Sequence, residues 1–180
     1  MKANVAFTAV ADLNAGERDA VDVLSRAVYP PAEWADWPGR KLEWEKPPRC
    51  VRVWGGDGEL ASYIGVVLRQ ATHDGRAVPI GGIGGVKTHP AARGRGYAAL
   101  GVQRAIEFFQ EQADVMFALL VCEPDLIPYY ARLGWREFGG TLLVRQYGAI
   151  VEFTFDRTMT LRVRRDGPID GVIDLCGPPW

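Results

Sequence analysis

The sequence predicts an α+β fold, similar to an α/β sandwich, in one domain. Residues 50–54 alternate apolar and polar side chains, and tight turns at 55–58 and 73–76 separate the strands that follow, which is typical of antiparallel hairpins. Apolar residues at helical spacing then indicate a helix at 97–112, and a continuous apolar run at 115–121 indicates a buried strand. Because 180 residues suffice for one full core, we expect a single domain over residues 1–180.

Composition excludes several classes of protein. The net charge is −1, so the chain lacks the basic excess that broad nucleic-acid binding requires. No segment has the apolar length of a membrane span, and the N-terminal stretch is too short and too polar for a secretion signal. Cys50, Cys122 and Cys176 form no zinc pattern with His73 and His89, so we expect reduced thiols and no metal site. These features predict a cytoplasmic protein.

The first half of the chain is predicted to hold one helix among strands. Residues 12–14 supply a helix cap, and an apolar stripe continues to about residue 27, before the proline pair at 30–31 ends the helix. Gly-rich turns at 55–58 and 73–76 separate later strands. The strands expected in this half cover residues 4–9, 50–54, 59–70 and 78–88. The last of them carries glycines at 81, 82, 84 and 85, which predict bare backbone beside the extended arm of a ligand.

The second half adds shorter elements to the helix and buried strand already described. A turn at 123–125 leads into a short helix at 126–133, with Gly134 just beyond its C-terminus. The last segment, 166–180, is turn-rich. The remaining strands are expected at 142–147, 150–155 and 158–164.

Residues 32–48 are rich in tryptophan and acidic side chains, and two interpretations stay open. The tryptophans cap the core, as large aromatic side chains usually do. Alternatively they form a pocket wall, where aromatic faces contact a sugar or cation and carboxylates attract amines. Nearby lysine and arginine residues offset part of the acidity, so charge does not decide between the two. On the second interpretation the substrate-binding residues are Trp34, Asp36, Trp37, Glu43 and Trp44.

The strongest functional signal lies in residues 86–104, where an extended stretch leads through a basic, Gly-rich loop into a helix. The first N–H groups of a helix have no partner within it, and they carry partial positive charge. Gly94 and Gly96 let the backbone adopt positive φ and approach a phosphate closely. Arg93 and Arg95 add fixed positive charge. The segment therefore predicts a diphosphate site.

The spacing of these residues narrows the choice of diphosphate ligand. A P-loop motif is absent, and the G-x-G-x-x-A pattern at 94–99 lies too far along the chain for a Rossmann site. The pattern R-x-x-G-x-A at 93–98, directly after V-x-x-x-P at 86–90, resembles the cofactor loop of the GCN5-related N-acetyltransferases (GNAT). The resemblance implies acetyl-CoA as cofactor. The residues that would bind it are Val86, Lys87, Thr88, Arg93, Gly94, Arg95, Gly96, Tyr97 and Ala98.

The same family implies a fold and a catalytic acid. The order of elements between residues 50 and 155 matches the GNAT fold, a central mixed, mostly antiparallel sheet flanked by helices. Residues 130–135, YARLGW, resemble the family pattern Y-x-x-x-G-F, whose tyrosine protonates the departing CoA thiolate. This implies Tyr130 as general acid, with a core aromatic as the alternative. Tyr129 is the neighbour most easily confused with it.

Nearly the whole chain also resembles, weakly, the aminoglycoside 2′-N-acetyltransferases. In that subfamily an acidic residue before a Trp-Glu pair and the C-terminal carboxylate contact the antibiotic, which implies such roles for Glu43 and Trp180. A glutamate on the strand before the loop is replaced by Gly84, and an Asp-rich acceptor loop is replaced by residues 146–150. A smaller aminosugar antibiotic, such as kasugamycin, is therefore the expected acceptor, with Gly84 and Glu123 beside it.

The general base stays open. An aminosugar amine is partly neutral near neutral pH, so a strong base is not required. Cys122 suggests an acyl-cysteine intermediate, but direct transfer in a ternary complex needs no such nucleophile. The candidate bases are Glu43, Glu123, Asp125, Glu152 and the carboxylate of Trp180.

The sequence thus predicts a resistance enzyme that uses acetyl-CoA to acetylate a small-molecule amine. One alternative is an acetyltransferase of the same fold that acts on a protein N-terminus or lysine. Another is a non-catalytic module that binds CoA or a dinucleotide. Many proteins of this fold dimerise, so a homodimer stays open, although no segment of the sequence marks an interface.

Overall fold

The structure, a computed structural model, describes residues 3–180 apart from the side chain of Trp34. The chain divides into two compact units. Unit 1 holds the residues up to Lys41, Pro47–Val66 and Gly84–Ala105, and unit 2 holds Leu42–Lys46, Val67–Ile83 and Ile106–Trp180. The chain passes from one unit to the other within β3 (Leu60–His73), β4 (Arg76–Thr88) and α3 (Tyr97–Glu111). Each unit is described by itself.

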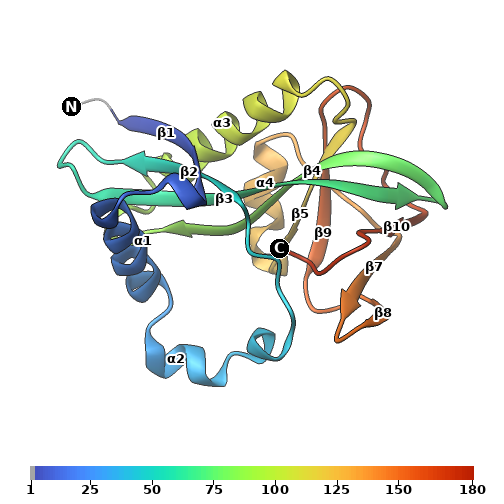
Figure 1. Cartoon of the computed structure of the whole chain (residues 1–180), viewed down its shortest axis with the longest axis horizontal. Helices are drawn as coiled ribbons and strands as arrows, with labels where there is room; N and C mark the ends of the chain where they lie inside the picture. Colours follow the sequence, from blue (N-terminus) through green and yellow to red (C-terminus); the bar gives the residue numbers. More distant parts are fainter. Residues whose placement is uncertain (1–2) are drawn as a thin grey trace. The chain divides into compact units, whose positions relative to one another are not determined.

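Unit 1 contains an antiparallel set of strands and the N-terminal helices (Figure 1). Strand β1 pairs with β2 so that Asn4 lies opposite Trp54, and β2 pairs with the first part of β3. Before α3, the elements of this unit are β1 (Asn4–Ala9), η1 (Val10–Asp12), α1 (Ala15–Val28), α2 (Pro31–Asp36), η2 (Pro38–Lys41), β2 (Arg49–Trp54) and η3 (Pro90–Ala92).

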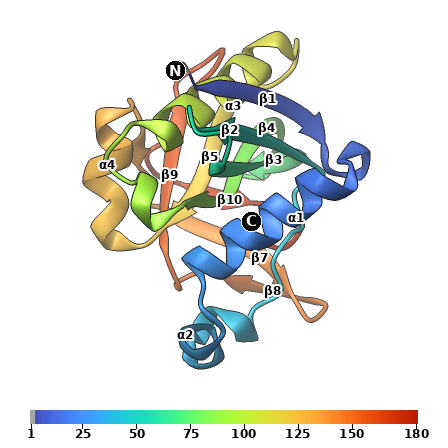
Figure 2. The same ribbon diagram turned by 90° about the vertical axis from the view of Figure 1, so that its left-hand side faces the viewer.

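Helix α1 begins with a reciprocal cap and packs on the strands of unit 1 (Figure 2). The Asn14 side chain accepts the Glu17 N–H, and the Glu17 carboxylate accepts the Asn14 N–H, each at 3.0 Å. Glu17 also pairs with Arg52, which is only 2% exposed and donates to Thr8 at 2.9 Å. The cap and this ion pair set where the helix starts and how it meets β2. Its apolar face joins a core of Leu13, Leu24, Cys50, Leu60 and Tyr63.

Unit 2 contains a mixed sheet in which most pairings are antiparallel. β4–β5 and β7–β10 are parallel, whereas β3–β10, β5–β9, β6–β9 and β7–β8 are antiparallel. The sheet order is β6-β9-β5-β4-β3-β10-β7-β8. The elements that follow α3 are β5 (Phe117–Cys122), η4 (Pro124–Leu126), α4 (Ile127–Arg132), β6 (Arg136–Glu137), β7 (Thr141–Gln146), β8 (Ala149–Glu152), β9 (Arg157–Arg162) and β10 (Val172–Asp174).

Two glycines of β4 make room for aromatic side chains in unit 2. A Cβ at Gly81 would overlap the ring of Phe109, and a Cβ at Gly82 would overlap the indole of Trp180. Trp180 is 4% exposed and belongs to the core cluster that includes Phe117 and Leu119. The sequence had suggested that this bare backbone accommodates a ligand arm. At these two positions the space is instead filled by the protein itself.

The prediction of a mixed, mostly antiparallel sheet flanked by helices is confirmed. Strand 4–9 and the starts of α1 and α3 agree closely with expectation. Strand β3 extends three residues beyond the expected end at 70, and the two short strands β6 and β10 were not foreseen. None of the helices among residues 3–180 combines the length and hydrophobicity needed to cross a membrane. The single domain stays a prediction.

Gly82→Ala tests the contact between β4 and Trp180. The added methyl group overlaps the indole, so we expect a loss of about 1–3 kcal/mol in unfolding free energy. Gly16→Ala is the control, because a Cβ there has only a 3.5 Å neighbour and the residue lies in a helix. In the Trp180→Ala background the cost of Gly82→Ala should largely disappear. Urea denaturation of the four variants measures this, and additive effects would contradict it.

Candidate active site

The connection between β4 and α3 has the backbone of an anion site. Its first turn, Pro90–Ala92, is capped by His89, whose Nδ1 accepts the Ala91 N–H at 3.2 Å. Gly94 and Gly96 have φ values of +76° and +80°, and a Cβ at either would meet no atom within 4 Å. The backbone conformation, rather than crowding, therefore requires glycine at both positions.

Helix α3 follows this turn directly. The bond from the Leu100 N–H to the Gly96 carbonyl, at 3.1 Å, is the first of the helical type. The N–H groups from Tyr97 up to that bond are therefore free of partners within the helix. Arg93 and Arg95 are exposed beside them. The donors, the positive-φ glycines and the two guanidinium groups suit a diphosphate, so the predicted loop residues fit CoA.

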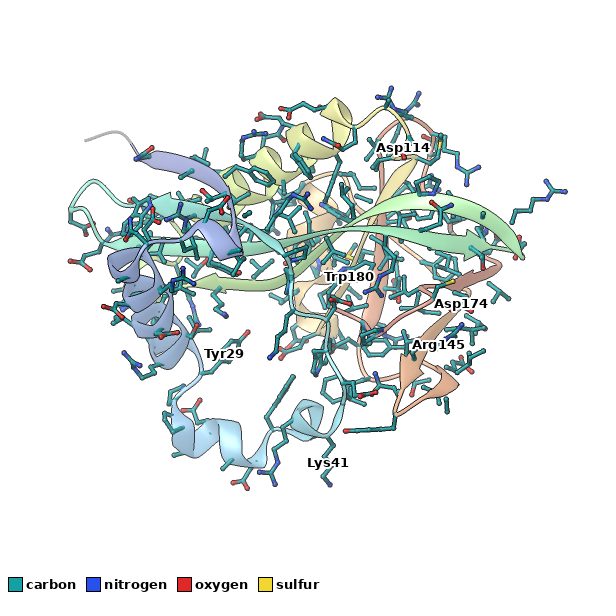
Figure 3. The ribbon with its side chains drawn as sticks, in the orientation of Figure 1. Tyr29, Lys41, Asp114, Arg145, Asp174 and Trp180 are labelled. Atoms are coloured by element: carbon teal, nitrogen blue, oxygen red, sulfur yellow. The ribbon has the colours of Figure 1, made fainter. Side chains whose placement is uncertain are left out.

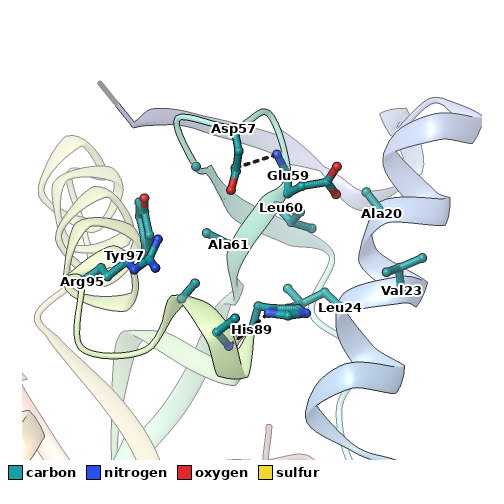
Figure 4. Close-up of a pocket in the computed structure, with 13 residues that line it drawn as sticks. Ala20, Val23, Leu24, Asp57, Glu59, Leu60, Ala61, His89, Arg95 and Tyr97 are labelled. Atoms are coloured by element: carbon teal, nitrogen blue, oxygen red, sulfur yellow. Dashed lines mark hydrogen bonds between the residues drawn. The ribbon is translucent and has the colours of Figure 1, made fainter. Parts of the chain in front are cut away.

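A hollow of about 310 Å³ lies in unit 1 beside this loop (Figure 4). It is lined by α1, by the turn between β2 and β3, and by the loop itself. Asp57 and Glu59 line it from the turn, while Arg95 and Tyr97 line it from the loop (Figure 4). The positive charge of Arg95 is therefore partly offset by carboxylates of the same unit.

The end of β4 has side chains that are already engaged. Lys87 donates from Nζ to Ser25 Oγ at 3.1 Å and lies 4.9 Å from the centroid of the Tyr63 ring. Burial lowers the pKa of Lys87. Thr88 Oγ1 lies 3.1 Å from Ser62 Oγ. We therefore expect Lys87 and Thr88 to contact a cofactor mainly through their main-chain atoms.

The glycines just before these residues change the course of the strand. Gly85 is exposed with φ of +55°, a conformation that weakens regular pairing inside a strand. Gly84, which was expected beside the acceptor, is buried, and its carbonyl lies 2.7 Å from where a Cβ of Gly65 would be. Val86 is half-buried. Residue 65 is therefore a glycine because β3 and β4 approach each other closely at this point in unit 1.

Tyr130 lies in an aromatic cluster of unit 2. It is 4% exposed, and its ring meets Tyr129 edge-on at 5.0 Å and Trp135 at 6.2 Å. Gly134, with φ of +90°, ends α4 and turns the chain so that Trp135 returns to the cluster. The Tyr129 hydroxyl is buried and has no hydrogen-bond partner among the described residues, and burial raises its pKa. These contacts fix the orientation of the Tyr130 ring.

Two carboxylates lie at neighbouring positions where β5 ends and β9 begins. Cys122 pairs with Arg157 at the end of the ladder, so the same register brings Glu123 opposite Asp156. Burial, followed by the charge of Glu123, raises the pKa of Asp156 to about 6. Burial, followed by the charge of Asp156, raises the pKa of Cys122 to about 11. This end of β5 therefore offers a carboxyl that titrates near neutral pH and a thiol that stays protonated.

The tryptophan-rich stretch is split between the two units. In unit 1, Trp37 is half-buried and folds over Gly39, while Asp36 is exposed; the side chain of Trp34 lies outside the described part. In unit 2, Trp44 packs edge-on against Phe153 at 6.0 Å and Phe155 at 6.2 Å. Trp44 thus packs against the core, as one of the two interpretations expects.

Glu43 connects the neighbouring stretch to the β7–β8 hairpin. Its N–H donates to Gln146 Oε1 and its carbonyl accepts from Gln146 Nε2, both at 2.9 Å. Its carboxylate accepts the N–H of Tyr147. The carboxylate expected to contact an acceptor is thus already bound to the protein.

A shallow pocket of about 430 Å³ opens beside this contact in unit 2. Aliphatic and aromatic side chains form most of its wall, and Glu152 carries the charge there. The pocket is lined by Leu42, Val144, Gln146, Val151, Glu152, Phe153, Thr154 and Phe155.

The last residues of the chain are fixed within unit 2. Trp180 Nε1 donates to the Leu119 carbonyl at 3.4 Å, and the Arg69 guanidinium lies 4.9 Å from the indole centroid. Arg69 also donates to the Pro178 carbonyl at 2.6 Å and pairs with Glu45. Earlier in the same tail, Asp174 pairs with Arg145 at 3.3 Å (Figure 3). The tail is therefore an ordered part of the unit.

Comparison with known proteins identifies the family. Residues 12–138 match the family described as acetyltransferase (GNAT) domain. ElaA of Escherichia coli shares 16% identity at a TM-score of 0.63, covering 89% of this chain and 100% of that chain. An acyl-CoA N-acyltransferase of Pseudomonas aeruginosa shares 19% identity at a TM-score of 0.60, covering 89% of this chain and 99% of that chain. YhbS of Escherichia coli, solved with CoA, shares 16% identity at a TM-score of 0.60, covering 97% of this chain and 89% of that chain.

The three structural likenesses concern the fold alone. A comparison with curated proteins finds no significant match. The loop at 93–98 and Tyr130 could be predicted as site residues from the sequence because both lie in short, contiguous motifs. Asp156 and Arg69 were missed, because the register of β5 with β9 and the path of the tail are long-range properties.

Asp156→Asn should change stability in a pH-dependent way. The pKa of Asp156 rises from 3.8 to about 6 in the folded chain, so its proton stabilises the fold below pH 3.8, and this contribution is lost as pH rises through about 6. The amide cannot ionise, so the variant should gain at most about 3 kcal/mol relative to the parent near pH 8 and little near pH 4. Urea denaturation across this range measures the difference. Asp125→Asn, at an exposed position nearby, is the control, and a pH-independent effect at Asp156 would contradict the assignment.

Proposed function

Because the chain belongs to the GNAT acetyltransferase family over residues 12–138, we propose that it transfers the acetyl group of acetyl-CoA to a primary amine of a small molecule. The observation that carries the proposal is the junction at residues 93–97, where two positive-φ glycines and two exposed arginines lead into the N-terminus of α3. When bound, acetyl-CoA supplies a thioester whose acyl carbon is open to attack by an amine. The residues of this chain provide binding, orientation and proton transfer.

The loop at 93–96 and the first turn of α3 bind the cofactor. Their N–H groups donate to the diphosphate oxygens, and Arg93 adds charge from an exposed position. Arg95 contributes less, since Asp57 and Glu59 share its hollow. The main chain of residues 84–88 receives the extended arm of the cofactor, because Gly85 leaves backbone exposed there.

Tyr130 donates the proton that the departing thiolate takes up. Its ring is held by Tyr129 and Trp135, so the hydroxyl is presented in one orientation. An ordinary phenol has a pKa close enough to that of a thiol for this transfer, and positioning supplies most of the effect.

Asp156 receives the proton that the acceptor ammonium loses. With a pKa of about 6, this carboxyl is a stronger base than an ordinary aspartate and is still mostly ionised at neutral pH. Glu123, directly opposite, helps to keep the pKa high. Cys122 is a poor nucleophile because its pKa is about 11, which favours direct transfer over an acyl-cysteine intermediate.

The acceptor implied by the sequence resemblance is an aminosugar antibiotic with few amines, and acetylation would then confer resistance. In this proposal Trp44 and Trp180 act indirectly, because Trp44 packs against Phe153 and Phe155 and Trp180 is buried in the core. The carboxylate of Glu43 supports the hairpin through Tyr147, so its role toward the acceptor is indirect. A homodimer and the role of the Trp180 carboxylate stay predictions.

A thiol-release assay with acetyl-CoA and a panel of amines tests the proposal. The panel contains kasugamycin, glucosamine, tobramycin, phenethylamine and a peptide with a free N-terminus. Thiol release that depends on one of the small amines is the expected result. Turnover of the peptide alone would indicate a protein substrate. No turnover with any amine, together with tight NAD(P) binding, would overturn the assignment.

Tyr130→Phe should lower kcat by at least about a hundredfold while leaving the Kd of acetyl-CoA nearly unchanged. The matched control is Tyr129→Phe, which removes a hydroxyl that has no partner among the described residues. Steady-state kinetics and isothermal titration separate the two effects. Equal turnover in Tyr130→Phe and the parent would remove Tyr130 as the acid.

Gly96→Ala should raise the Kd of acetyl-CoA, by about tenfold, because alanine is strained at φ of +80° and shifts the N–H groups of the loop. Gly58→Ala is the matched control: Gly58 has φ of +88° and open space around it, but lies in the β2–β3 turn. Both variants should lose similar stability. If both also bind acetyl-CoA like the parent, the loop is not the diphosphate site.

A further inference from the structure

The β7–β8 hairpin of unit 2 exposes an unusual amount of apolar side chain. Tyr147 is 73% exposed, Ile150 58% and Val151 37%, and Phe155, just after the hairpin, is 36% exposed. Every residue of β8 is exposed. Such a concentration of apolar surface commonly marks a binding site.

The pocket beside this hairpin has a wall that is fixed before any ligand arrives. Phe153 is 7% exposed and, like Phe155, is held by the edge-on contact with Trp44. The two hydrogen bonds between Gln146 and the Glu43 main chain hold the facing segment against β7. A preformed apolar wall favours a rigid apolar ligand, because little ordering is needed on binding.

The polar groups of the pocket restrict the ligand's charge and hydrogen bonding. Glu152 is the charged residue among those that line it, and it is exposed at the mouth. Gln146 has little hydrogen-bonding capacity left for a ligand, since its oxygen accepts the Glu43 N–H and its nitrogen donates to the carbonyls of Glu43 and Arg145. One anionic group on an apolar wall matches one cationic group on an apolar body. A ligand with many hydroxyl groups would leave most of them unpaired there.

We propose that this pocket binds the acceptor, and that the acceptor is a primary amine with one positive charge and an aromatic or alkyl body. The ammonium group lies at Glu152, while the body lies on Val151, Phe153 and Phe155. This inference rests on the proposed function and names its substrate class. It differs from the aminosugar expected from the sequence, because the wall supplies apolar surface and few free hydrogen-bonding groups.

The segment that follows the pocket supports this assignment. Phe155, in the wall, is directly followed by Asp156, the carboxyl proposed to receive the amine's proton. The chain thus places the apolar wall and the proposed proton acceptor in consecutive residues of one unit. Glu152 binds the amine as an ammonium ion, and the proton passes to Asp156 once the amine leaves this ion pair.

The experiment uses phenethylamine, glucosamine, kasugamycin and tobramycin as probes, with binding and turnover measured separately. Isothermal titration gives the Kd of each amine without acetyl-CoA, and thiol release gives its KM and kcat. We expect phenethylamine to bind most tightly and to be acetylated. Glu152→Gln should weaken its binding by about five- to tenfold, and Phe155→Ala by about tenfold, with the Kd of acetyl-CoA unchanged. Glu107→Gln, which alters an exposed carboxylate on α3, is the control.

The outcomes separate this inference from the proposed function. Turnover of aminosugars with weaker phenethylamine binding, or no effect of Glu152→Gln, would overturn the inference and leave the acetyltransferase assignment intact. Phenethylamine binding that Glu152→Gln weakens, without acetyl transfer to any amine, would support the ligand class and overturn the proposed function. A second copy of the chain covering the hairpin would appear as a doubled mass in sedimentation, with no amine binding, and would also overturn the inference.

Discussion

The contact between Gly82 and Trp180 is the constraint on which most of unit 2 depends. The indole lies where a side chain at residue 82 would be, so the strand must lack a Cβ for the tail to pack. Arg69 then covers the indole, binds the Pro178 carbonyl and pairs with Glu45. Because Arg69 is partly buried, its charge needs these partners. One missing methyl group thus permits a connected set of contacts that includes the tail and the segment 42–46.

That segment in turn supports the apolar pocket, to whose lining it contributes Leu42. The Glu45 N–H donates to the Pro179 carbonyl at 2.6 Å, and Glu43 is bound to Gln146 on β7. Between them, Trp44 holds the aromatic rings that line the pocket. The tail and the hairpin are therefore joined by three consecutive residues. These contacts with the core fix the shape of the pocket wall, while the mouth of the pocket on β8 remains exposed.

The sequence predicted local features well and long-range features poorly, for physical reasons. The start of α1 and the loop before α3 are encoded by neighbouring residues, namely the Asn14 cap and the glycines at 94 and 96, so they could be read directly. Strand β10 is held by pairing with β3 and β7, and its own three residues carry little signal. Likewise, the sequence around Gly82 predicts bare backbone beside a ligand, because no neighbouring residue reveals an indole about a hundred residues away. The pKa of Asp156 is raised by burial and then by the charge of Glu123, and no local pattern specifies the register that brings the two residues together.

The chemistry at the end of β5 also follows from that register. Burial acts on both the thiol of Cys122 and the carboxyl of Asp156, and it disfavours the charged form of each. The consequences are opposite for catalysis. A pKa of about 11 removes the thiolate that covalent catalysis would need, whereas a pKa of about 6 brings a carboxyl close to neutral pH. The same desolvation therefore suppresses a nucleophile and improves a base, and this combination suits direct transfer to an amine.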